Sequence, residues 1–97
     1  MAIGKPRLTA IFGALADPTR LAVVERLISG PASVSELAEP FKMAGPSFLK
    51  HPRVLEDAGI AHSRKKGRIR TVALRADALR EVEQWTLRHR RLWERRL

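Results

Sequence analysis

Apolar residues recur every three or four positions near both ends of the chain, a spacing typical of amphipathic helices. The spacing predicts one helix over residues 8–16 and a longer one over residues 76–97. We expect their apolar faces to form a homodimer interface, because a small domain seldom exposes this much apolar surface. The residues expected in the interface are Leu8, Ile11, Phe12, Leu15, Leu79, Val82, Trp85 and Trp93.

Capping signals predict a second helix directly after the first. Asp17 can accept hydrogen bonds from free backbone N–H groups, and Pro18 fits the first helical position, where no N–H is needed. Gly30-Pro31 then ends the helix, because glycine tolerates positive φ and proline cannot continue the hydrogen-bond pattern.

A helix-turn-helix is predicted over residues 33–58. Residues 33–36 read SVSE, a capping box that opens a short third helix ending at Pro40. A connection over residues 41–44 leads to a fourth helix, which begins near Gly45 or Pro46 and ends at Ala58. The second helix of such a pair commonly enters the major groove of DNA.

Strand-forming residues follow the fourth helix. Ile60–Arg64 and Arg68–Leu74 are predicted to pair as a hairpin, or wing (residues 60–74), with Lys65-Lys66-Gly67 as its tight turn. The expected fold is mainly α (α+β), a single winged helix-turn-helix domain over residues 1–97. Its expected order is four helices, two strands and a last helix.

The chain is strongly basic, with 19 lysine and arginine residues against 10 aspartate and glutamate residues and a net charge of +9. Concentrated positive charge attracts polyanions such as nucleic acid. The predicted wing carries one cluster, expected to bind phosphates: Arg64, Lys65, Lys66, Arg68 and Arg70. The last helix carries another: Arg88, Arg90, Arg91, Arg95 and Arg96. In the fourth helix, the candidates to approach bases or phosphates are Ser47, Lys50, His51 and Arg53.

The sequence gives little indication of a catalytic site or a metal site. There is no cysteine, no glycine-rich phosphate loop and no nucleophile with an orienting base, since Ser47 and His51 lack a third partner. His89 and the carboxylates of the last helix are poorly spaced for a zinc site, which needs three or four converging ligands. We therefore expect no enzymatic activity, no metal and no cofactor.

No apolar run is long enough to span a bilayer. Lys5 and Arg7 precede the apolar stretch 8–16, as in a secretion signal, but the stretch is short for one and fits an amphipathic helix better. The expected location is the cytoplasm, without a membrane partner.

Several of these motifs together resemble the ArsR/SmtB-type winged-helix regulators, in particular the branch that lacks a cysteine metal site. The motifs are LADPTR at residues 15–20, GPASVSELA at 30–38, the segment from Lys50-His51 to Ile60, and residues 85–97. The resemblance implies a homodimer in which the first and last helices pack together. It also implies binding to an imperfect inverted repeat in double-stranded DNA, usually as a repressor.

The fourth helix departs from the family pattern at three places. Leu49 replaces a common serine, Pro52 replaces a leucine, and Ala44-Gly45 replaces a Ser-Leu start. Proline inside a helix lacks an N–H and clashes with the preceding turn. We therefore expect a kink near residues 48–51, with a break and a restart at Pro52 as the other outcome. We expect these departures to affect the recognition of DNA bases more than the fold.

Two alternatives to a DNA-binding regulator remain. The first is a winged-helix protein-interaction module that has lost DNA reading, which Leu49 and Pro52 favour. The second is an RNA- or single-strand-binding domain, which predicts aromatic side chains beside the basic wing. The wing has none, and Trp85 and Trp93 fit a dimer core better.

Overall fold

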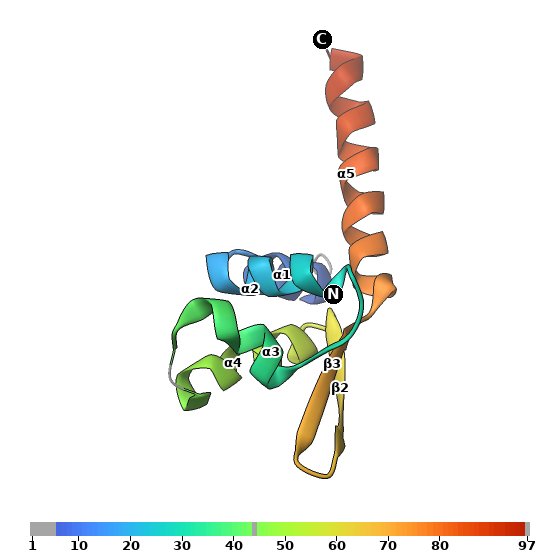
Figure 1. Ribbon diagram of the computed structural model, residues 1–97. Helices are drawn as coiled ribbons and strands as arrows, with labels where there is room; N and C mark the ends of the chain where they lie inside the picture. The colour runs from blue at the N-terminus through green and yellow to red at the C-terminus, as the bar shows by residue number, and fades with distance from the viewer. Residues whose placement is uncertain (1–5, 44, 97) are drawn as a thin grey trace.

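The computed structural model describes residues 6–43 and 45–96, and in these ranges the chain forms five α-helices and a small antiparallel sheet (Figure 1). The helices are α1 (Pro6–Leu15), α2 (Pro18–Leu27), α3 (Val34–Ala38), α4 (Gly45–Asp57) and α5 (Ala76–Arg96), with a short 3-10 helix, η1 (Glu39–Phe41), after α3. The strands are β1 (Ala32–Ser33), β2 (Ala61–Lys66) and β3 (Ile69–Leu74). The expected mainly α winged helix-turn-helix fold is confirmed, with β1 as an addition.

The predicted caps determine where α2 and α3 begin. Oδ2 of Asp17 accepts a hydrogen bond of 3.0 Å from the backbone N–H of Arg20. The Ser33 hydroxyl accepts from the N–H of Glu36 at 3.1 Å, and the Glu36 carboxylate accepts from the N–H of Ser33 at 2.8 Å. These backbone hydrogen bonds hold the pKa of Asp17 and that of Glu36 below their ordinary values. Both carboxylates are therefore charged at neutral pH.

The sheet has the order β1-β3-β2, so β3 is its central strand. Ala32 pairs with Val72 on one side, and Lys66 pairs with Ile69 across the hairpin turn on the other. The turn is Gly67-Arg68 and not the predicted Lys65–Gly67, because β2 extends through Lys66. Gly67 has a φ of 62°, which suits the first turn position of a type II′ hairpin and requires glycine.

The core lies where α1–α4 meet the sheet. Its largest fully buried side chains are Phe48, Ile11, Leu37, Leu55, Ile60, Val23 and Val72. Two residues expected in a dimer interface belong to this interior instead. Ile11 is completely buried and Leu8 is only 8% exposed, so neither side chain is available to a partner chain.

α5 projects from the domain on the side opposite to the hairpin (Figure 1). The Cα radius of gyration is 15.5 Å, whereas a compact chain of this length would have about 12–13 Å. The first half of α5 packs on α1, where the rings of Phe12 and Trp85 meet edge to face at 5.4 Å. The second half stands clear of the other elements and exposes Leu92 and Trp93. Within the described ranges, no helix is both long and apolar enough to cross a membrane.

α4 continues as one helix through Pro52. A break with a restart at this residue is therefore wrong, and a kink remains a prediction. Pro52 is buried together with Phe48, His51 and Leu55, so the ring contributes to the apolar face of the helix. Since proline has no N–H, the carbonyl of Phe48 cannot have its usual partner four residues later.

Candidate nucleic-acid interface

The two faces of α4 differ in burial and in charge. The inward face consists of the four buried residues just described. The outward face exposes three of the predicted contact residues, Ser47, Lys50 and Arg53, together with Leu49. A helix that turns its polar, basic face outward in this way can present that face to a polyanion.

His51 is the exception among the predicted contact residues. Its side chain is only 4% exposed and packs edge-on against Phe48, with ring centroids 5.8 Å apart. Nδ1 of His51 lies 3.4 Å from Nη1 of Arg20 and 3.8 Å from Oδ2 of Asp17. The expectation that His51 approaches bases or phosphates is wrong, because one helical step from Lys50 turns its ring into the core.

The environment of His51 keeps its imidazole neutral at pH 7. Burial lowers the pKa of His51, the positive charge of Arg20 lowers it further, and Asp17 partly opposes both. Since the guanidinium of Arg20 can only donate, Nδ1 accepts and the ring proton resides on Nε2. Nε of Arg20 also donates to the carbonyl of Ala14 at 2.7 Å. One arginine thus connects the end of α1, the start of α2 and the buried face of α4.

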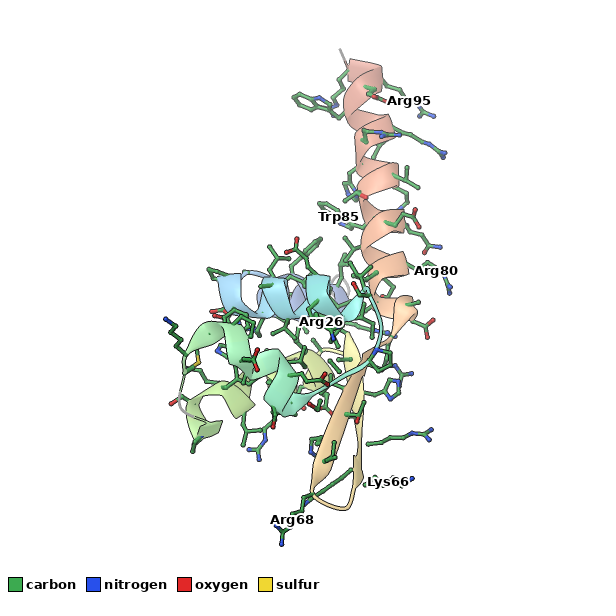
Figure 2. The ribbon with its side chains drawn as sticks, viewed as in Figure 1. Arg26, Lys66, Arg68, Arg80, Trp85 and Arg95 are labelled. Atoms are coloured by element: carbon green, nitrogen blue, oxygen red, sulfur yellow. The ribbon has the colours of Figure 1, made fainter. Side chains whose placement is uncertain are left out.

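All five predicted wing residues are exposed, but they lie on different sides of the hairpin. Lys65 pairs with Arg70 in the sheet register, and both share a strand face with Ser63, which contacts α4. Because side chains alternate along a strand, Arg64 and Lys66 occupy the other face. At the hairpin tip, Lys66 and Arg68 point to opposite sides (Figure 2). Only part of the wing cluster therefore borders α4.

A chain of hydrogen bonds joins the base of the wing to α4. The Ser63 hydroxyl donates to Oε1 of Glu56 at 2.9 Å, and Nη1 of Arg70 donates to the same hydroxyl at 2.9 Å. This contact holds the Arg70 guanidinium beside the exposed face of α4. The roles of Glu56 and Ser63 were not predicted from the sequence, because each belongs to a different element and only the fold brings them together.

An open groove of about 720 Å³ lies between the wing and the helix-turn-helix. A smaller hollow of about 300 Å³ follows it along α4. Both are lined by Val34, Leu49 and Arg70, so they adjoin, and together they are here called the basic channel. The basic side chains along it are Arg53, Lys65, Arg68 and Arg70. Glu36, Glu56 and Asp57 also line it. Val34 and Leu49, which are among its apolar residues, were not predicted as contacts.

The second basic cluster lies far from the first. Its arginines, at positions 88, 90, 91, 95 and 96, are exposed on the projecting half of α5. Arg95 lies near the free end of this helix, whereas Lys66 and Arg68 lie at the tip of the hairpin (Figure 2). The fold therefore separates the two clusters and leaves only the first at the helix-turn-helix.

Among the residues that the structure describes, no three histidine or acidic side chains lie close enough together to hold a metal ion. The three histidines illustrate this separation. His51 is buried in α4, His62 lies on β2, and His89 stacks on Trp85 of α5 at 4.3 Å.

Comparisons with known proteins agree with this geometry. Residues 15–64 match a family described as "Helix-turn-helix domain". A solved ArsR family transcriptional regulator is 53% identical and superposes with a TM-score of 0.88, covering 91% of this chain and 97% of that one. An HTH-type transcriptional regulator of Mycobacterium tuberculosis is 43% identical over 61 residues, which are 63% of this chain and 57% of the relative. The transcriptional repressor SdpR of Bacillus subtilis is 29% identical over 77 residues, covering 79% of this chain and 86% of SdpR.

The order of elements, the exposed basic face of α4 and these similarities lead to one assignment. The chain belongs to the ArsR family of winged helix-turn-helix, DNA-binding transcriptional regulators.

Proposed function

We propose that this protein is a homodimeric repressor that binds an inverted repeat in double-stranded DNA in the cytoplasm. The observation that carries the proposal is the basic channel beside the exposed face of α4. It combines a helix of suitable size for the major groove with positive side chains that can neutralise phosphates on either side.

In this proposal α4 enters the major groove and the wing follows the adjacent backbone. Lys50 and Arg53 have long, exposed side chains that can reach base edges or phosphates, and Ser47 lies near the amino-terminal end of α4. Arginine and lysine commonly pair with guanine in the major groove. The wing residues Arg64, Lys65, Lys66, Arg68 and Arg70 contact phosphates, which position the protein without selecting a sequence.

The projecting half of α5 supports the homodimer. Val82, Trp85, His89 and Leu92 recur at spacings of three and four, which aligns them on one side of the helix. Trp93 beside them is 63% exposed, an unusual state for a large aromatic side chain. A second copy of α5 would cover this face, together with Phe12 of α1. The two copies of α4 would then read half-sites about 34–36 Å apart, or a multiple of that distance.

Repression is the direction of regulation that the similarities favour, because one relative, SdpR, is named a transcriptional repressor. A dimer bound across a promoter would block RNA polymerase from reaching the promoter DNA simply by occupying it. This mode of action requires no enzymatic activity and no cofactor.

Selection of bound duplexes from a random library, at two salt concentrations, tests the proposal. We expect an enriched inverted repeat, with affinity that falls steeply as salt rises because phosphate contacts release counterions. A single enriched half-site without symmetry would contradict the homodimer. Absence of any salt-dependent duplex binding would instead favour a winged-helix module that binds other proteins.

A further inference from the structure

Leu49 is an exposed leucine in the middle of the candidate DNA interface. Its side chain is 38% exposed and lies on the side of α4 that faces the basic channel. It lines both hollows of that channel, with Val34 beside it and Arg53 and Arg70 as basic neighbours. An apolar side chain thus lies beside basic groups suited to a polyanion, in hollows that Glu36, Glu56 and Asp57 also line.

Packing within the protein covers only part of this side chain. The buried residues of α4 are Phe48, His51, Pro52 and Leu55, and Leu49 lies at the edge of this face, where it lines the smaller hollow together with Pro52. Leu49 lies one turn before Arg53, and both side chains line the smaller hollow, so DNA that contacts Arg53 there also lies near Leu49. The exposed part of Leu49 is therefore available to a ligand in the basic channel.

The major groove offers leucine one apolar partner. Base edges there present hydrogen-bond donors and acceptors, which leucine cannot satisfy, and also the C5-methyl group of thymine. Contact with that methyl removes apolar surface from water, whereas contact with the amino group of cytosine would leave a buried donor without a partner. A leucine at this position discriminates in favour of thymine.

We propose that Leu49 is a specificity-determining residue that reads the C5-methyl group of one thymine in each half-site. Val34 forms the second apolar side of the same contact, because it lines the channel next to Leu49. The inference rests on the proposed function, since it requires α4 to lie in the major groove. It adds a base-pair preference at one position that the basic residues alone would not provide.

The first arm of the test changes only the DNA, by removing one methyl group at a time, and the second arm changes the protein. Each thymine of the selected operator is exchanged in turn for deoxyuridine, which keeps the base pair and lacks only the methyl group. We expect one thymine per half-site at which the exchange weakens binding about fourfold, the effect of removing one buried methyl group. Exchange in both half-sites should weaken binding about fifteenfold.

The protein arm uses Leu49→Ala and a matched control, Leu21→Ala. Leu21 lies on α2, is 44% exposed and lines neither hollow of the basic channel. Leu49→Ala should bind the thymine and deoxyuridine operators equally, whereas Leu21→Ala should keep the wild-type preference. Because both leucines are exposed, both variants should fold, and circular dichroism melting verifies this.

The outcomes separate the two proposals. Equal binding of every deoxyuridine operator by the wild type, or a thymine preference that persists in Leu49→Ala, would overturn the role of Leu49 and leave the proposed function intact. Failure of the wild type to bind any duplex in a salt-dependent manner would overturn the proposed function, and this inference with it.

Discussion

Nη1 of Arg20 lies 3.4 Å from Nδ1 of His51, and this contact joins the start of α2 to the buried face of α4. The same guanidinium donates to the carbonyl of Ala14 at the end of α1. The Asp-Pro-Thr-Arg run at residues 17–20 therefore helps to position α4 from its buried side. Its members do not need to contact DNA to influence how DNA is bound.

The stability of the protein should fall as the pH drops below neutrality because of His51. Its pKa is lowered in the folded state by burial. The unfolded chain, where histidine has a pKa of about 6.5, therefore takes up the proton first. The contribution of neutral His51 is complete above that value and is lost progressively below it. Thermal melting between about pH 7.5 and pH 5 measures the effect.

Two variants test this assignment. His51→Gln removes the titrating group, so its melting temperature should depend less on pH over the same range. His62→Gln removes an exposed histidine on β2 and serves as the matched control. If His51→Gln and the wild type lose stability equally on acidification, His51 is not the responsible group.

The wing should contribute affinity without sequence preference. Replacing Lys65, Lys66 and Arg68 with alanine should weaken binding to all duplexes similarly. The plot of log affinity against log salt should become shallower by about one unit for each phosphate that the variant no longer neutralises. Measurements on the selected operator and on unrelated DNA, over a range of salt concentrations, check both statements.

The control for the wing variant removes the same charge elsewhere. Arg80, Arg90 and Arg91 are exposed on α5, away from the basic channel, so their replacement by alanine should leave the salt dependence unchanged. If the wing variant lost affinity for the operator alone, the wing would read bases, and the separation of roles between wing and α4 would be wrong.

Local sequence signals were sufficient for most of the fold. The caps at Asp17 and Ser33 act on backbone groups within three residues, so the sequence predicts the starts of α2 and α3 without knowledge of the tertiary structure. β1 was not predicted because a strand of two residues, the second of which is the cap Ser33, is too short to show periodicity, and only the pairing of β1 with β3 makes it a strand.

The candidate site was less predictable, because it depends on which way side chains point. Lys50 and His51 are neighbours in a basic segment, yet one faces solvent and the other the core. The periodicity of α4 could have indicated this, since His51 lies three residues after buried Phe48 and four before buried Leu55. The contact between Ser63 and Glu56 had no such signal, because it depends on how β2 lies against α4.

The wild-type protein should sediment as a dimer at micromolar concentration, and Trp93→Asp should shift it towards monomer. Burial of a largely exposed tryptophan is worth about 2–3 kcal/mol, and a symmetric interface contains two copies. The dissociation constant should therefore rise at least about a hundredfold. Trp85 and Arg80 point to opposite sides of α5 (Figure 2). A substitution of Arg80 should therefore have little effect on the dissociation constant of the dimer.

Ile28→Asp is the matched control for the dimer. Ile28 is a well-exposed apolar residue at the end of α2, outside α1 and α5, so its replacement should leave the sedimentation unchanged. A wild-type monomer at micromolar concentration would contradict the dimer. Equal dissociation of the two variants would place the interface elsewhere.

Pro52→Leu should raise the melting temperature. Leucine restores an N–H that can donate to the carbonyl of Phe48, and it removes the clash of the proline ring with the preceding turn, together worth up to about 3 kcal/mol. The adjoining hollow of about 300 Å³ gives the longer side chain room. At about 4–8 °C for each kcal/mol, a gain of half that size shifts the transition by about 6–12 °C.

Operator affinity, measured on the same variant, tests whether the proline also directs DNA reading. If Pro52 bends α4, then a straight helix re-aims Ser47 and Lys50, and Pro52→Leu should change either the affinity or the selected half-site. Pro46→Ala is the control, because Pro46 lies in the first turn of α4, where no N–H is needed and no gain in stability is expected. A more stable Pro52→Leu variant with unchanged binding would mean that the proline has no role in recognition. No gain in stability would mean that the native helix already accommodates the proline ring without strain.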